Sequence, residues 1–513
     1  MLIHRRNIIK GMGASALAVS TPWPVVAQQE TPRRGGTLNV AVIHDNTKTL
    51  DPRLSIQLDE RQVLFLLYNT LLTVQPDFSL KPDLAKEWSV ENDGKRYVFT
   101  LQDGVKFQDG TPFDAAAVKW NIEQRLDEKV KSSQRPQLLP VIASVEVVAP
   151  LVVAFNLNYA YPSLLADLAD RAGMMVSPAG SEKYGADFGR NPVGTGPFVL
   201  KQWIQGTNIT LTRNPNYWRQ GEPYLDEVVF RTVPNAVLGL QRIGIGEIDV
   251  VAPLGPSEIR QIDPRTTRAI KFPVGRWYAL QWQVDKPPFN NAKLRMAIAH
   301  AIDRNRINQI LFDGEGTIAD GLSPPSGLWY ANPYKPTFQY SPEKARALLK
   351  ESGWNMDEPI TLWAPSEAVY NKTSQLVGEQ LTAAGLKVTL SPIVQSEFYA
   401  RVVQKVVNFT PTSWGQRADP DSLYYFLLHS KGTGNTTGYS NPQTDRLLEQ
   451  ARSITNREER AKIYGEVQDL FMQDLPYIPL VLGADYVAVS TKLRNWVPSP
   501  DSYARFQGAW KTA

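Results

Sequence analysis

The sequence predicts a mixed α/β protein with more than one domain. Its 513 residues are enough for two to four domains of about 100–200 residues each, or for two large lobes. Short segments in which apolar residues alternate are interspersed with amphipathic helical patterns along the whole chain. Because no internal repeat and no flexible Gly/Ser linker divides the chain, we expect any lobes to be joined by strands.

The predicted strands share a period of two in hydrophobicity and many β-branched residues. They cover Thr37–Ile43, 97–101, 209–212, 228–233 and, after a helix that ends at Gly385, 386–390. The helices show apolar residues every three to four positions and recognisable capping residues. They begin after Asp114, include the apolar stripe Leu294, Ala297, Ile298 and Ala301, restart at Asp303, run from Ser341-Pro342 to Gly353, and cover 422–428, 445–454 and 457–472.

Composition and charge exclude several classes of protein. The formal net charge of +4 does not indicate nucleic-acid binding, because basic and acidic residues are dispersed and nearly balanced. Three of these charges belong to Arg5, Arg6 and Lys10 in an N-terminal segment without acidic residues. The absence of cysteine excludes disulfides, thiol catalysis, zinc–thiolate sites and a lipid-modified N-terminal cysteine.

Residues 1–27 have the features of an export signal. A basic region is followed by a mildly apolar stretch and by Val25-Val26-Ala27, which approximates a signal-peptidase site. Arg5-Arg6 resembles the twin-arginine motif. We therefore expect cleavage near Ala27, export to the periplasm by the twin-arginine route, and a soluble mature protein.

The sequence contains no recognisable catalytic or metal-binding motif. Besides His4, the histidines are His44, His300 and His429, and none shows the spacing of a metal site. There is no nucleophile elbow and no P-loop. Asp419 and Asp421 are an acid–base pair by type, but we expect Asp421 to cap the helix over 422–428. The prediction is a protein that is not an enzyme and that has neither metal nor cofactor.

Aromatic residues are abundant instead, with 13 Trp and 20 Tyr. Aromatic walls with a few polar anchors are typical of sites that bury a small polar ligand. The aromatic residues near polar or Gly/Pro-rich segments are therefore candidates, although any single Trp is more often part of a core. They are Trp203, Trp218, Trp277, Tyr278, Trp282, Trp329, Trp363 and Trp414.

Several segments together resemble solute-binding protein family 5, the periplasmic peptide-, dipeptide- and oligopeptide-binding components of ABC transporters. The most specific stretches are LYNTLLTVQPDFSLKPDLAKEWSV and YVFTLQDGVKFQDGTPFDAAAVKWNIE, between residues 67 and 123. NPVGTGPFVL, YLDEVVF and FNNAKLRMAIAHAIDR follow further along the chain. The similarity extends over nearly all of residues 35–510.

This resemblance implies a two-lobed, large type II periplasmic-binding-protein fold with an extra subdomain in lobe I and a hinge between the lobes. The expected division is an export signal over 1–27, lobe I over 28–275, lobe II over 276–489, and a C-terminal return to lobe I over 490–513. The implied function is a monomeric receptor that closes on a small-molecule ligand, nominally a peptide. It then delivers the ligand to an ABC permease driven by a cytoplasmic ATPase.

The sequence departs from the family pattern at one position. Peptide-binding members have a Trp-x-x-Asp segment whose carboxylate meets the ligand's ammonium group, whereas here the segment is Trp414-Gly415-Gln416-Arg417. In one interpretation, Asp419 supplies the missing negative charge. In another, Arg417 binds an anionic group by bidentate hydrogen bonds. In a third, Arg417 only pairs with Asp419 or Asp421.

The predicted ligand-binding residues come from three places in the chain. Trp414, Arg417 and Asp419 are expected on the wall of lobe II, with Trp277, Tyr278 and Trp282 near the hinge. His44, Asp45 and Asn46 are expected in the first loop of lobe I. Alternative ligands are an opine-like anion, a sugar conjugate or a chelated metal, and a more distant alternative is a periplasmic hydrolase that uses Asp419 or Asp421 with His44.

Overall fold

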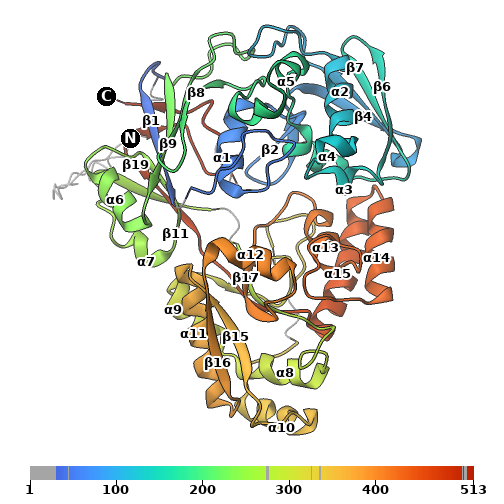
Figure 1. The fold of residues 1–513 in the computed structure, drawn as a ribbon, viewed down its shortest axis with the longest axis vertical. Coiled ribbons are helices and arrows are strands. Elements are labelled where there is room, and N and C mark those ends of the chain that lie inside the picture. Colours follow the sequence, from blue (N-terminus) through green and yellow to red (C-terminus); the bar gives the residue numbers. More distant parts are fainter. Residues whose placement is uncertain are drawn as a thin grey trace, which may run out of the picture.

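The chain folds into two bodies, drawn one above the other in Figure 1. This computed structural model describes residues 31–512 apart from 44, 273–275, 325, 334–336, 500 and 502–504, so the predicted export signal lies outside the described residues. We call lobe I the body formed by residues 31–272 and 486–512, and lobe II the body formed by 276–482. Both contain helices and strands, which confirms the mixed α/β prediction.

A seven-stranded mixed sheet forms the centre of lobe I, in the order β12-β19-β11-β1-β10-β9-β8. The central strand β1 runs parallel to both β10 and β11, while the other neighbours are antiparallel. Alternating β1 residues such as Leu38 and Val40 enter the core, as the period of two predicts. The strands are β1 Thr37–Ile43, β8 Phe198–Ile204, β9 Asn208–Arg213, β10 Glu227–Val233, β11 Val250–Leu254, β12 Thr267–Lys271 and β19 Tyr486–Ser490.

A small subdomain of lobe I, residues 85–167, is built on an antiparallel sheet in the order β4-β5-β7-β6. It has a core of its own, in which Phe99 and Phe155 meet edge to face at 5.3 Å. The predicted cap of its main helix is confirmed, because Asp114 Oδ1 accepts a hydrogen bond from the Ala117 N–H at 2.9 Å. The elements are β4 Ala85–Glu91, β5 Arg96–Leu101, α2 Ala115–Leu126, α3 Arg135–Leu138, β6 Ile142–Ala149, β7 Val152–Leu157 and α4 Leu164–Asp167.

The remaining elements of lobe I surround these two sheets. They are α1 Leu58–Leu67, β2 Leu72–Val74, β3 Leu80–Pro82, α5 Pro178–Tyr184, α6 Ala236–Gly244, α7 Pro256–Ile259, β20 Leu493–Arg494 and β21 Trp510–Lys511. The C-terminal segment is attached to the large sheet, since Lys511 Nζ lies 2.8 Å from Asp249 Oδ1 and donates to the Thr37 carbonyl.

Lobe II is organised around a four-stranded sheet, β14-β18-β13-β17, and a parallel pair, β15-β16. Helices cover this sheet, and their buried faces form one continuous apolar core with it. The strands are β13 Trp277–Trp282, β14 Thr317–Ile318, β15 Ile360–Pro365, β16 Val388–Ile393, β17 Phe409–Trp414 and β18 Tyr477–Leu482. The helices are α8 Ala292–Ala301, α9 Arg304–Phe312, α10 Pro342–Ser352, α11 Ala368–Ala383, α12 Gln395–Val403, α13 Asp421–Leu428, α14 Pro442–Ser453 and α15 Arg457–Asp474.

The chain passes between the two large sheets twice, from β12 to β13 and from β18 to β19. The first passage contains the predicted boundary at residue 275. The second predicted boundary, after residue 489, is about five residues too late. Strand β19 already pairs with β11 and β12 in the sheet of lobe I.

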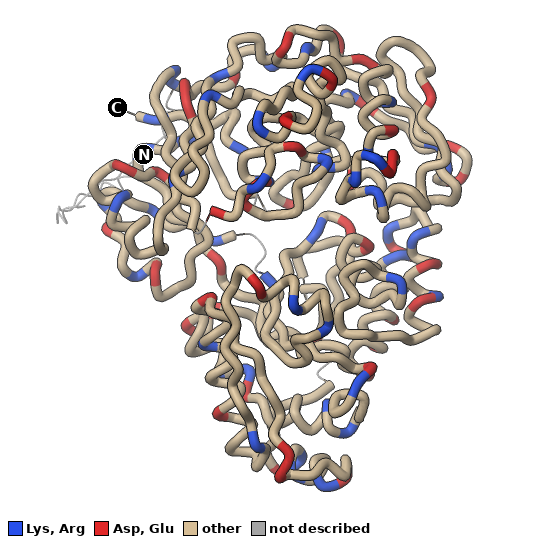
Figure 2. Tube along the Cα trace, in the orientation of Figure 1, with Lys and Arg blue, Asp and Glu red and all other residues tan. Residues whose placement is uncertain are grey.

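Charged residues of both signs are interspersed over both lobes (Figure 2). This distribution agrees with the dispersed charge noted in the sequence. In the part of the chain that the structure describes, no helix combines the length and the apolar character that crossing a membrane requires.

Candidate functional site

The two chain passages between the lobes are hydrogen-bonded to each other. The Phe272 N–H donates to the Asp485 carbonyl at 3.0 Å, and the Gly483 N–H donates to the Arg276 carbonyl at 2.9 Å. Asp485 also accepts a hydrogen bond from the Arg276 N–H through Oδ2, at 3.2 Å. Two paired passages between rigid bodies are the geometry of a hinge.

The Trp414–Arg417 segment follows strand β17 of lobe II, on the side of the hinge. Strands β13 and β17 are antiparallel, with Trp277 opposite Trp414. The first residue of β13 and the last residue of β17 therefore lie side by side. The indole of Trp414 packs edge to face on Phe426 at 5.5 Å, and its buried Nε1 has no hydrogen-bond partner among the described residues. A buried donor without a partner is uncommon in a folded protein, so Trp414 remains a candidate for the site.

Arg417 has no ion-pair partner within the described part of the chain. Among the described residues, its guanidinium makes one long hydrogen bond, 3.4 Å, to the Gln416 carbonyl. It lies near Asp170 of lobe I: burial raises the pKa of Asp170, but the guanidinium groups of Arg61, Arg171 and Arg417 outweigh this and lower it below its usual range. The charge of Arg417 in lobe II therefore acts on a carboxylate of lobe I.

Asp419 is held by hydrogen bonds from both lobes rather than left free for an ammonium group. It receives two hydrogen bonds from Arg460, at 2.7 and 2.8 Å, and one from Ser163 Oγ of the small subdomain at 2.8 Å. Asp421 is held by Arg452 Nε, 3.0 Å from its Oδ1. The interpretation in which Arg417 pairs with Asp419 or Asp421 is therefore wrong.

The predicted capping role of Asp421 is also wrong. The N-cap of α13 is Pro420, and Asp421 is the first residue of the helix. Its carboxylate instead accepts a hydrogen bond from Tyr161 Oη of lobe I at 3.2 Å. Asp421 thus joins lobe II to the small subdomain, as Asp419 does through Ser163.

Trp277 and Trp282 belong to the core of lobe II, so the prediction that they contact ligand is not supported. Their exposed fractions are 0% and 1%, and their indole N–H groups donate to the carbonyls of Gly321 and Leu475, each at 2.7 Å. Tyr278, the neighbour of Trp277 in β13, is half-buried and packs on Phe312 at 5.0 Å. It lies at the hinge and remains a candidate.

The predicted residues of the first loop are held within lobe I. Asp45 accepts hydrogen bonds from the N–H groups of Thr47 and Gly206, at 2.9 and 3.2 Å. Asn46 donates to Asp59 Oδ2 through its backbone and side-chain nitrogens. His44 lies outside the described residues. Nothing in these contacts gives Asp45 or Asn46 a free polar group directed at lobe II.

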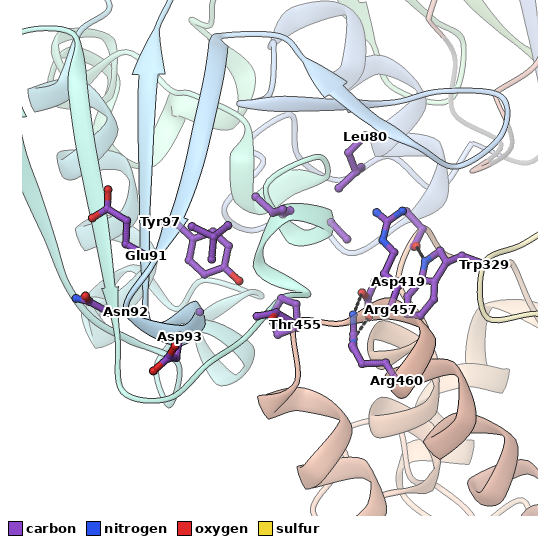
Figure 3. A pocket seen from close by; sticks show the side chains of 16 residues that line it. Leu80, Glu91, Asn92, Asp93, Tyr97, Trp329, Asp419, Thr455, Arg457 and Arg460 are labelled. Carbon is purple, nitrogen blue, oxygen red and sulfur yellow. Dashed lines mark hydrogen bonds and ion pairs between the residues drawn. The ribbon is translucent and has the colours of Figure 1, made fainter.

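A pocket of about 490 Å³ lies where the small subdomain meets lobe II. Figure 3 shows Asn92, Asp93 and Tyr97 on one side and Trp329, Asp419 and Arg460 on the other, with Thr455 between them. Burial raises the pKa of Tyr97 to about 12. Because residues of both lobes line this pocket, its shape depends on how far the lobes are closed.

The described histidines are packed rather than arranged as ligands. His300 is 3% exposed, and its Nδ1 lies 2.6 Å from the Gln339 carbonyl oxygen. His429 is 1% exposed and stacks on Tyr425. Over the described ranges, no cluster of three or more His, Asp or Glu side chains is placed to hold a metal ion.

Sequence reasoning missed three residues of this region. Arg276 directly precedes the strand that was placed near the hinge, so its position was a usable signal. Asp170 and Arg460 gave no local signal, because Arg417, whose charge acts on Asp170, and Asp419, which pairs with Arg460, are distant from them in sequence. Of the predicted site residues, Trp414, Arg417 and Tyr278 lie at the hinge-side edge of lobe II.

Comparisons with known proteins place the chain in one family. Residues 79–435 match the model described as bacterial extracellular solute-binding proteins, family 5 Middle. The chain is 32% identical to the glutathione-binding protein GsiB of Escherichia coli K12, over 92% of this chain and 94% of that protein. It is also 32% identical to GsiB of Salmonella paratyphi A, over 98% of each chain.

Solved structures agree with the family match. The periplasmic binding protein DppA of Helicobacter pylori, in complex with the peptide STSA, gives a TM-score of 0.85 at 24% identity and covers 93% of this chain and 98% of that one. AgaA of A. tumefacien R10, in complex with agropinic acid, gives 0.81 at 26% identity over 93% and 99%. The predicted two-lobed binding-protein fold is confirmed. The chain belongs to the bacterial extracellular solute-binding proteins of family 5, and it is a solute-binding protein rather than an enzyme.

Proposed function

We propose that this protein is the periplasmic receptor of an ABC importer and that it captures a small anionic peptide between its lobes. The closed complex delivers the ligand to a membrane permease driven by a cytoplasmic ATPase. The observation that carries the proposal is the guanidinium of Arg417, which has no ion-pair partner among the described residues and whose charge acts on Asp170 of lobe I. A ligand that meets groups of both lobes stabilises the closed state.

The relatives support a peptide as the ligand class. The GsiB proteins are named for glutathione binding. Glutathione is a tripeptide with two carboxylates and one ammonium group, so it is a net anion near neutral pH. An arginine in place of the family's acidic residue suits such a ligand, because guanidinium and carboxylate form paired, charge-assisted hydrogen bonds.

An anionic non-peptide ligand is the second candidate. AgaA, 26% identical to this chain, was solved with agropinic acid, and an opine of that kind also presents carboxylates. The hydrolase alternative is set aside, because the chain belongs to a solute-binding family and arginines hold both Asp419 and Asp421.

Isothermal titration calorimetry tests the proposal directly. Glutathione, an uncharged-side-chain tripeptide and agropinic acid are titrated into the wild-type protein, Arg417→Gln and Arg417→Lys. We expect glutathione to bind the wild type and to lose about 10- to 100-fold in affinity for Arg417→Gln, the range of a hydrogen bond to a charged group. Tighter binding of agropinic acid supports the second candidate, and equal binding of all three ligands by the wild type and Arg417→Gln contradicts both.

A further inference from the structure

Arg276 occupies the first described position of lobe II after the passage from β12. Its backbone N–H and carbonyl bond to Asp485 and Gly483 of the second passage, at 3.2 and 2.9 Å. The position of Arg276 is therefore fixed by both passages. Any group that binds its side chain binds at the hinge.

The guanidinium of Arg276 has neutral hydrogen-bonding partners. Nη1 donates to Ser413 Oγ at 3.2 Å, and the Tyr370 hydroxyl lies 2.7 Å from the same oxygen. Asp485 and Glu367 are the acidic groups near it. Burial lowers the pKa of Arg276, but Tyr278, Tyr370 and both carboxylates outweigh it and raise the pKa. No described carboxylate is within ion-pair distance of the guanidinium.

Arg276 and Arg417 lie at the same edge of lobe II. In the β13–β17 register, Trp277 is opposite Trp414. Arg276 is the residue before Trp277 in the chain, and Arg417 comes three residues after Trp414. The Ser413 partner of Arg276 is the neighbour of Trp414 in β17. Two guanidinium groups, neither ion-paired with a described carboxylate, thus come from residues close to neighbouring strand ends, and an anionic ligand would satisfy both.

We propose that Arg276 binds a second carboxylate of the ligand, separate from the carboxylate bound by Arg417, so that the protein selects dicarboxylate peptides. This inference rests on the proposed function. A ligand with two carboxylates satisfies both guanidinium groups, whereas a ligand with one leaves a half-buried cation without its partner. Selectivity therefore has two sources. A ligand with two carboxylates gains a second ion pair, and a ligand with one carboxylate leaves a guanidinium without a counterion.

The experiment is a pair of double-mutant cycles measured by calorimetry. Glutathione and its two monoamides, one at the glycine carboxyl and one at the γ-glutamyl α-carboxyl, are titrated into the wild type, Arg276→Gln and Arg417→Gln. The wild type should lose about 10-fold or more for each monoamide. Arg276→Gln should lose a similar factor in affinity for glutathione, and it should bind one of the two monoamides as tightly as it binds glutathione. Arg417→Gln should show the same equality for the other monoamide.

Controls separate the possible failures. Arg265→Gln removes an exposed arginine that pairs with Asp263 at 2.7 Å and should change no affinity, and thermal unfolding of each variant establishes that it is folded. If Arg276→Gln does not fold, the wild-type losses for the two monoamides still decide, because the inference requires both. Glutathione binding that is unchanged in a folded Arg276→Gln overturns the inference but leaves the proposed function intact. No binding of any dicarboxylate peptide by the wild type overturns both.

Discussion

Replacement of Asp419 by alanine should destabilise the protein, whether or not ligand is present. The Asp419 carboxylate receives two hydrogen bonds from Arg460, one from Ser163 Oγ and one from the Asp421 N–H. The side chains of Arg460 and Asp419 are only 2% and 9% exposed. Alanine leaves the Arg460 guanidinium buried without its counterion.

The expected cost follows from this burial. Removal of one partner of a buried ion pair costs about 3–5 kcal/mol, because the remaining charge is desolvated and uncompensated. Replacement of both partners by apolar residues, Asp419→Leu with Arg460→Met, should recover most of that loss. Asp263→Ala is the matched control. Its carboxylate also pairs with an arginine, Arg265, but both side chains are exposed, so its free energy of unfolding should change little.

Urea unfolding of the ligand-free protein, followed by Trp fluorescence and by circular dichroism, measures these differences. Coincidence of the two transitions is checked first, because a two-lobed protein need not unfold in one step. The family pattern suggests another role, in which an acid near this position meets the ligand's ammonium group. Wild-type stability of Asp419→Ala combined with lost ligand binding would refute the structural role.

Three further predictions follow from contacts within and between the lobes. Ser163→Ala removes hydrogen bonds to Asp419 and Arg460 at 2.8 and 3.1 Å, so calorimetry should show ligand affinity about 2- to 10-fold weaker; unchanged affinity would show that these bonds do not favour closure. Burial, followed by the nearby charge of Asp421, raises the pKa of Asp167 well above its usual value. The native state therefore binds the proton more tightly than the unfolded chain, and stability is lost as pH rises from the unfolded towards the native pKa. Urea unfolding should find Asp167→Asn more stable than the wild type at pH 8, by a margin that vanishes towards pH 4; a pH-independent margin contradicts this. Trp282→Ala should lower the free energy of unfolding by about 3–5 kcal/mol in the same assay and leave the ligand affinity of the folded protein unchanged. Weaker ligand binding by the folded variant would show that Trp282 belongs to the site.

The sequence was informative wherever local physics decides structure. Alternating residues in Thr37–Ile43 predicted β1 to the residue, and Asp114 was correctly identified as the cap of α2. The same capping argument failed at Asp421, since a tertiary partner, Arg452, competes for its carboxylate. Local preference is overridden where a buried charge has a better partner elsewhere in the fold.

The candidate site was less predictable than the fold. Residue type does not reveal that a strand is buried on both faces, so Trp277 and Trp282 were assigned to the ligand although β13 buries them. The charge reversal at Arg417 was visible in the sequence. Its surroundings were not, because Asp170 and Arg276 approach this region only through the fold of the whole chain.

Native mass spectrometry of the protein purified from its own periplasm tests the central claim most directly. Closure between two lobes retains ligand, so the bound molecule can be released by denaturation and identified. The proposed function predicts a small peptide-like anion, and the role of Arg276 requires that it carry two carboxylates. Release of neutral or cationic peptides would contradict the claim that unpaired arginines at the edge of lobe II select the ligand.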